Sequence, residues 1–229
     1  QDAALLPPGH SLRARVPIGL GTELLMQGRI AQAVPLLRIG VDQGAVSRSL
    51  QPGEIANALS VLGSALLQQD QPDLALDILR AAADRYGEAG LLPGKASALI
   101  AAGSAADRTG DRDGGLALRK AALSLLQGLP RQSELGVALA RFKLAQSLAH
   151  AGQLPEAEQM EAAALATLAR LRPETHFQVT NSSMALGWIE VLRGRTATGL
   201  ERVKQAFRLS VSANDQVEAA RNQVVGVLD

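Results

Sequence analysis

The sequence predicts an all-α protein, a right-handed α-solenoid built from antiparallel helix pairs. Three observations predict this fold class. Five segments of equal length align without a gap, and their starts are 42, 40, 42 and 42 residues apart. Apolar and alanine residues recur every three or four positions between them, which indicates helices rather than strands. Residues that end or begin helices recur with the same period, as a stack of two-helix units requires. The segments are LGTELLMQGRIAQAV from Leu20, LGSALLQQDQPDLAL from Leu62, AGSAADRTGDRDGGL from Ala102, LAQSLAHAGQLPEAE from Leu144 and LGWIEVLRGRTATGL from Leu186.

The turn inside each pair is predicted at a residue that tolerates left-handed backbone and closes the first helix. These residues are Gly28, Asp70, Gly110, Gly152 and Gly194. Pro72 and Pro155 then open second helices, where a missing N–H is not needed. Pro35 lies further into its helix; if that helix begins near Ala31, the missing N–H belongs to the unpaired first turn.

Turns between pairs are predicted where proline stands beside polar or glycine residues. They are QPGE at Gln51, GLLPG at Gly90, LPRQS at Leu129 and LRPET at Leu171. We therefore expect residues 1–229 to form a single repeat array with units at 14–55, 56–95, 96–137, 138–179 and 180–213, followed by a terminal helix over 215–228. The first residue is Gln1, and the last helix, with Val224, Val225, Val227 and Leu228, is apolar for the cap of an array. We therefore expect the segment to come from a larger chain.

Small residues recur inside the helices, although a glycine there costs about 1 kcal/mol relative to alanine. The first helices carry Gly21, Gly63, Gly103, Ala145 and Gly187, and the second helices carry Ala33, Ala75, Gly115, Ala157 and Gly199 twelve residues later. In an antiparallel hairpin these two sites would face each other and let the backbones approach closely. A third small site, at Gly40, Ala82, Ala122, Ala164 and Ala206, is expected to admit the next pair.

Composition excludes several function classes. The net charge is +1 and there are only five aromatic residues, so neither an attractive field nor a stacking platform for nucleic acid is expected. No apolar run approaches the roughly 20 residues of a membrane-spanning helix. Cysteine is absent, which removes disulfides and thiolate chemistry but leaves the compartment open. We expect a cytoplasmic protein, with export to the periplasm as the alternative.

No motif predicts catalysis, a cofactor or a metal site. His150 is expected to end one first helix and His176 to open the next, too far apart to share a metal ion. DRDGG from Asp111 resembles the start of a calcium loop but lacks the closing glutamate, and GLLPGKA from Gly90 lacks the spacing and the hydroxyl residue of a phosphate loop. Both are interpreted as turns, and the segment is predicted not to be an enzyme.

The leucine-glycine pair in the first helices and the alanines at fixed offsets in the second helices resemble the tetratricopeptide repeat (TPR) family. The match covers about residues 13–211. The aromatic positions of the family are mostly leucine or alanine here, and the period is about 42 rather than 34 residues. This longer form is similar to the repeats of kinesin light chains and of helical sensor regions in bacterial regulators and kinases.

The resemblance implies that the first helices line a concave groove that takes a protein or peptide partner. One face of these helices carries the candidate residues. They are Arg15, Asn57, Ser60, Ser64, Gln68, Ser104, Arg108, Phe142, Gln146, His150, Asn181, Met184 and Trp188. Amides there would bond a peptide backbone, the arginines a carboxylate, and Trp188 would be an apolar anchor. The alternative interpretation is a face that is polar only for solubility, with Trp188 packed on the following helix.

These observations favour a non-catalytic binding module, the sensor or scaffold region of a larger, bacterial regulatory protein. Two alternatives stay open. The chain could be a structural spacer or a self-association platform in which the last helix docks on another copy. It could also be an accessory domain of an enzyme whose catalytic part lies elsewhere.

Overall fold

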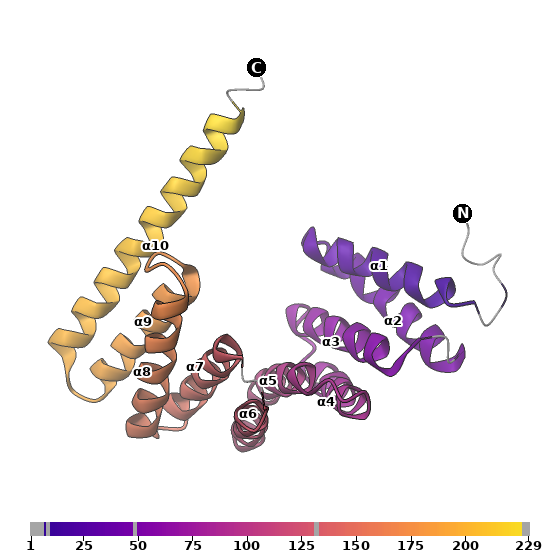
Figure 1. Ribbon diagram of the computed structural model, residues 1–229, viewed down its shortest axis with the longest axis horizontal. Helices are drawn as coiled ribbons and strands as arrows, with labels where there is room; N and C mark the ends of the chain where they lie inside the picture. Colours follow the sequence, from indigo (N-terminus) through magenta and orange to yellow (C-terminus); the bar gives the residue numbers. More distant parts are fainter. Residues whose placement is uncertain (1–6, 8–9, 48–49, 131–132, 226–229) are drawn as a thin grey trace. The chain divides into compact units, whose positions relative to one another are not determined.

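The described residues of the computed structural model form ten α-helices and no strand (Figure 1). The structure describes residues 7, 10–47, 50–130 and 133–225, and of residues 47 and 214–225 only the backbone. The helices are α1 (Leu12–Met26), α2 (Ile30–Ser47), α3 (Pro52–Gln68), α4 (Pro72–Glu88), α5 (Leu92–Thr109), α6 (Arg112–Gln127), α7 (Glu134–His150), α8 (Leu154–Leu171), α9 (Phe177–Leu192) and α10 (Thr196–Val225).

The chain divides into two compact units, Gln1–Leu129 with α1 to α6 and Pro130–Asp229 with α7 to α10. Within each unit, consecutive helices pair as hairpins, and each hairpin packs on the next one through a second helix and the following first helix. First helices also contact one another, α1 with α3, α3 with α5, and α7 with α9. This arrangement confirms the predicted all-α solenoid of helix pairs.

The predicted turns inside the pairs are confirmed by the backbone. Glycines at all four predicted positions have φ between +73° and +92°, and Asp70 has φ +60°. Asp70 is the only residue other than glycine with a positive φ among the described residues. Asp111, in the rejected calcium motif, accepts a hydrogen bond from the Gly114 N–H at 2.9 Å and caps α6. The motif is therefore a helix start, as expected for a turn.

The first two sets of small residues let the hairpin helices approach closely, as predicted. A Cβ on Gly187 would lie 2.8 Å from the carbonyl oxygen of Gly199, and one on Gly103 would lie 3.0 Å from that of Gly115. The third set does not serve the next pair where the structure tests it. A Cβ on Gly40 would lie 2.8 Å from the Ala14 carbonyl oxygen, which belongs to its own hairpin. At Gly40 the expectation was wrong, because this residue packs against the first helix of its own pair.

Several helix boundaries differ from the prediction. The first helices from α3 onward begin about one turn before the predicted unit starts, because the helix starts at Gln51, Leu91, Ser133 and His176 set them rather than the repeat period. α2 begins at Ile30, so Pro35 lies inside the helix beyond its first turn and leaves a carbonyl of that turn without its helical N–H.

The predicted separate helix over 215–228 is instead the end of α10, which continues without a break to Val225 (Figure 1). No glycine or proline interrupts the sequence there, so nothing stops the helix. The expectation of an apolar cap at Val224, Val225, Val227 and Leu228 rests on side chains that the structure does not describe.

The cores are rich in alanine and leucine. In the first unit Leu37, Leu62, Leu66 and Leu79 are almost fully buried among alanines such as Ala75. Each such leucine contributes about 1.5–3 kcal/mol of transfer free energy. Alanine adds little per residue, but it lets neighbouring helices pack at short distance.

Turn residues link successive hairpins within each unit. Arg108 near the end of α5 donates to the Leu67 carbonyl oxygen and to Asp70 in the preceding turn, both at 2.5 Å. Arg193 and Arg195, beyond α9, both bind Glu158 near the start of α8, Arg195 at 2.6 Å. Hydrogen bonds from Arg195 and then Arg193 lower the pKa of the Glu158 carboxyl. Both of these ion-pair groups therefore connect the end of one first helix to the hairpin before it.

Candidate functional site

Part of the predicted groove face is hollowed in the second unit, between α7 and α9. A pocket of about 300 Å³ is lined by the predicted residues Gln146, His150 and Trp188. Its other lining residues are Ala149, Ala185, Ile189 and Leu192. Gln146 and Trp188 occupy equivalent places in successive first helices, and so do His150 and Leu192, because the repeat spacing is 42. Two neighbouring first helices thus build this pocket from matching positions.

The α7/α9 pocket has mainly apolar walls and two polar side chains at its edge. Trp188 is 52% exposed and Leu192 is 62% exposed. Such large apolar side chains on a surface are candidates for binding, and tryptophan is enriched among residues that dominate binding energy. His150 and Gln146 can donate or accept hydrogen bonds beside them. The expectation that Trp188 only packs on the following helix is therefore disfavoured by its exposure.

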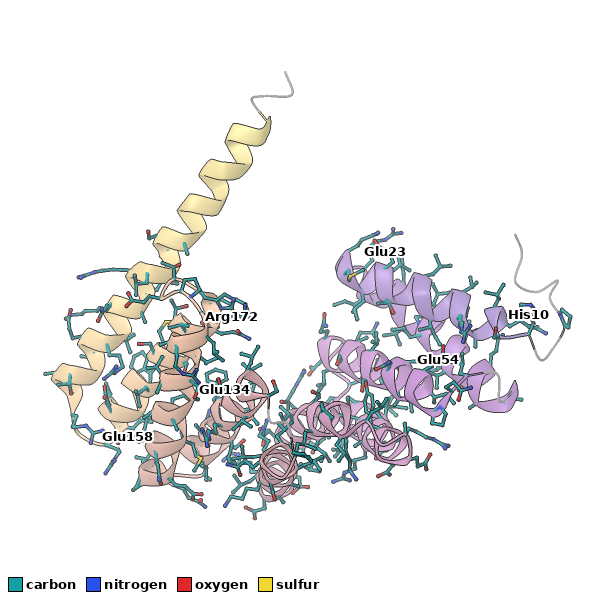
Figure 2. All side chains as sticks on the ribbon, in the orientation of Figure 1. His10, Glu23, Glu54, Glu134, Glu158 and Arg172 are labelled. Carbon is teal, nitrogen blue, oxygen red and sulfur yellow. The ribbon has the colours of Figure 1, made fainter. Side chains whose placement is uncertain are left out.

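A second pocket of about 300 Å³ lies in the first unit, between α1 and α3. It brings together the predicted residues Arg15 and Asn57, with Glu54, Leu50 and Val61 among its other walls. Arg15 binds Glu54 at 2.8 Å, and Figure 2 shows Glu54 on the side of α3 that faces α1. The hydrogen bond from the Gln51 backbone N–H lowers the pKa of the Glu54 carboxyl, and Arg15 lowers it further. Glu54 was missed because its place after Gln51 indicates a helix start.

Several predicted site residues are already engaged inside the fold. Asn57 accepts a hydrogen bond from the Tyr86 hydroxyl at 2.6 Å, and Arg108 binds the turn at Asp70. The Ser64 hydroxyl donates to its own helix, at the Ser60 carbonyl oxygen. The Ser104 hydroxyl donates within its helix and accepts a hydrogen bond from Arg119 at 3.1 Å. These side chains therefore stabilise the fold through internal bonds more directly than they offer groups to a ligand.

The remaining predicted residues line neither pocket. Gln68 and Asn181 are exposed, and Ser60 and Met184 are half-buried. The half-buried Phe142 ring has the Lys143 ammonium 5.3 Å from its centroid. Repeat position placed these residues on first helices, but it does not distinguish the parts of a face that are hollowed.

A buried carboxyl between α8 and α9 was also missed. Glu161 is fully buried, and its Oε1 accepts a hydrogen bond from the buried Ser182 hydroxyl at 2.5 Å. Burial raises the pKa of Glu161 to about 8, although Ser182 and Lys143 oppose the shift. The equivalent residues in earlier hairpins are Leu37, Leu79 and Arg119, all buried. The sequence did contain a signal for this carboxyl, because Glu161 stands at a repeat position that is leucine in the first two hairpins.

Among the described residues, no group of three or more histidine, aspartate or glutamate side chains is placed to hold a metal ion. None of the described helices is both long enough and apolar enough to cross a membrane.

Solved structures with the same fold identify the class of this architecture. A putative kinesin light chain from Podosopora anserina with nearly identical TPR-like repeats has a TM-score of 0.70 and 17% identity, over 89% of this chain and 98% of that one. The apo form of RapI has a TM-score of 0.77 and 12% identity, over 94% and 76% of the two chains. A Rap protein complexed with Competence and Sporulation Factor has a TM-score of 0.72 and 14% identity, over 90% and 56%.

The chain therefore has the fold of TPR-like repeat proteins, as the repeat pattern predicted. A scan against models of protein families matches none of them, and a search of curated proteins finds no match. The resemblance thus rests on the three-dimensional arrangement of the hairpins.

Proposed function

We propose that this chain is a non-catalytic module that binds a segment of another protein or a peptide, with the α7/α9 pocket as its main anchor site. The observation that carries the proposal is the exposed Trp188 beside Gln146 and His150 in a pocket of about 300 Å³. This volume suits one large apolar side chain of a ligand better than a buried cofactor. The polar groups at its edge would bond the ligand backbone.

The similar structures support this proposal. One of them is a Rap protein complexed with Competence and Sporulation Factor, so the same fold is known to hold a partner. We infer further that the chain is the sensor or scaffold region of a larger bacterial regulatory protein that acts in the cytoplasm. We also propose that residues 1–229 form a single array of five repeat units, as the repeat spacing predicts.

The sole tryptophan of the chain makes the proposal directly testable, because fluorescence from Trp188 reports what enters the pocket. A random peptide library displayed on phage is selected against the chain, and the enriched peptides are synthesised. They should carry a large apolar residue and shift the Trp188 emission to shorter wavelength on binding. Trp188→Ala has no tryptophan, so its affinity is measured by isothermal titration calorimetry alongside that of the parent. The substitution should weaken binding by roughly 30-fold, the loss of a dominant contact of about 2 kcal/mol.

The matched control is Phe177→Ala. Phe177 is on the same helix, is 65% exposed and does not line the pocket, so its removal should leave the affinity unchanged. Peptides whose affinity is equal for the parent chain and Trp188→Ala would show that the pocket is not the binding site.

A second candidate function is self-association, which the exposed apolar side chains of α10 favour.

A further inference from the structure

One face of α10 exposes apolar side chains although the opposite face packs on α9. Leu200, Phe207 and Val211 are 37%, 59% and 42% exposed. Their spacing of seven and four residues places them on one side of the helix. The half-buried Val203 borders this side and also packs on α9, since a Cβ on Gly187 would lie 2.8 Å from the Val203 Cγ2. Figure 1 shows α10 running along α9 and past its end. This face is called the α10 stripe, and it consists of Leu200, Val203, Phe207 and Val211.

In three other hairpins, those of α2, α4 and α8, the second helix contacts the first helix of the next hairpin. The residues equivalent to Phe207 are Val41 in α2, Ala83 in α4 and Leu165 in α8, which are buried or half-buried. Those three helices contact α3, α5 and α9 respectively. The α10 stripe is therefore a docking face for a first helix, left without one among the described residues.

The other half of such a contact is exposed on α1. Leu12, Val16 and Leu20 are 44%, 38% and 55% exposed and follow one another at four-residue spacing. This face is called the α1 stripe. The residues equivalent to Val16 and Leu20 in α3, α5 and α9 are 6% exposed or less, and each of these helices contacts the second helix before it. They are Ala58, Ala98 and Ser182, and Leu62, Ala102 and Leu186.

The α8–α9 contact fixes how the two stripes match. Glu161 on α8 bonds Ser182 on α9, and the equivalent residues are Val203 in α10 and Val16 in α1. A buried polar pair is thus replaced by two valines. The antiparallel register then places Leu200 near Leu20 and Phe207 near Leu12.

We propose that this chain associates head to tail with copies of itself, the α10 stripe of one copy receiving the α1 stripe of the next as α8 receives α9. The occupant is a second copy because both complementary faces are carried by the same chain in matching register. Because the two faces differ, each copy uses one face for each neighbour, and the assembly is open-ended or a ring rather than a symmetric pair. The α7/α9 pocket is not part of this contact, so self-association stands or falls apart from peptide binding.

The test uses two charge variants in sedimentation equilibrium, Leu20→Glu on the α1 stripe and Phe207→Glu on the α10 stripe. Both residues are more than half exposed, so the substitutions should keep the fold, and circular dichroism checks this. The average mass of the parent chain should rise with concentration. Each variant alone should remain monomeric at concentrations at least tenfold higher. An equimolar mixture should form a 1:1 dimer and nothing larger, because only one intact pair of faces remains.

Cross-linking tests the register, since the chain has no cysteine of its own. A mixture of Val16→Cys and Val203→Cys copies should form a disulfide-linked dimer under mild oxidation. Asp77→Cys, at an exposed site of α4, is the matched control and should not cross-link to Val203→Cys.

Two results would overturn the proposal. A parent chain whose mass stays that of a monomer at every concentration would mean that other segments cover the stripes. Dimers of the Leu20→Glu variant alone, or efficient cross-linking of Val203→Cys with itself, would indicate a symmetric α10 contact instead.

Discussion

At the scale of single residues, Glu161 differs most from what the repeat pattern predicts. Repeat position alone suggests an apolar side chain there, and the structure has a carboxyl without water access. The Oε2 atom has no hydrogen-bond partner among the described residues, so ionisation would leave a buried charge poorly compensated. The pKa of about 8 means that the carboxyl is mostly protonated at neutral pH.

This raised pKa predicts a pH-dependent stability. The folded state holds the Glu161 proton more tightly than the unfolded state, whose pKa is near 4.5. The stabilisation is therefore fully present below pH 4.5 and is lost as the pH rises through about 8. The free energy of unfolding should fall by at most about 1.4 kcal/mol per pH unit within this window. Urea titrations across the window measure it.

Glu161→Gln is the matched variant, because its amide oxygen still accepts from Ser182 but does not ionise. The fall in stability should be much smaller in this variant, and above pH 8 it should be more stable than the parent chain. Identical pH profiles for the two proteins would contradict the assignment.

Residue identity also explains which of the predicted site residues lie together in the structure. Trp188, Gln146 and His150 share a pocket because repeat position and helical spacing together place them on facing helices. The engagement of Arg108 with Asp70 could not be predicted, since a long side chain has many partners within reach. Exposure of a face was predictable, whereas the internal bonds of its polar residues were not.

At the scale of elements, the helix pairs depend on small residues at their closest approach. A Cβ on Gly63 would lie 2.5 Å from the Leu79 Cγ, a distance at which the neighbour must move. The pattern of glycines and alanines predicted this, together with the turns. The helix starts were less predictable, because Gln51 and Leu91 precede helices without being strong capping residues.

Gly63→Leu should therefore destabilise the chain by about 1–3 kcal/mol through overpacking. Gly19→Ala is the control, since a Cβ at Gly19 meets nothing within 4 Å and alanine favours the helix by up to about 1 kcal/mol. Thermal unfolding should give a lower Tm for the first variant and an equal or higher Tm for the second. A Gly63→Leu chain that melts at the temperature of the parent would refute the close contact.

At the scale of the whole molecule, the described helices of each unit contact their hairpin partner and helices of the neighbouring hairpin in that unit. Stability in such an array is approximately a sum over hairpins and the contacts between neighbours. Damage to one hairpin should therefore spread over a short distance. The buried Arg119 is the place to test this, because it binds Asp107 at 2.7 Å inside the α5–α6 hairpin.

Arg119→Ala should cost on the order of 3 kcal/mol, as expected when one partner of a largely buried ion pair is removed. Hydrogen exchange should accelerate strongly in α5 and α6 and remain unchanged in α9. Arg108→Ala, which removes an exposed ion pair with Asp70, should cost at most about 1 kcal/mol. Equal acceleration across all ten described helices would mean that the chain unfolds as one cooperative body.

The recurrence of one docking contact has a consequence for how such a chain changes through descent. Since α2, α4 and α8 offer the same kind of face and α3, α5 and α9 the matching one, gain or loss of a whole block of 40 or 42 residues restores the same kind of contact at the junction. A deletion of any other length places a helix out of register with its neighbour. Gene duplication can therefore lengthen this protein one hairpin at a time, while the gene tolerates few intermediate lengths.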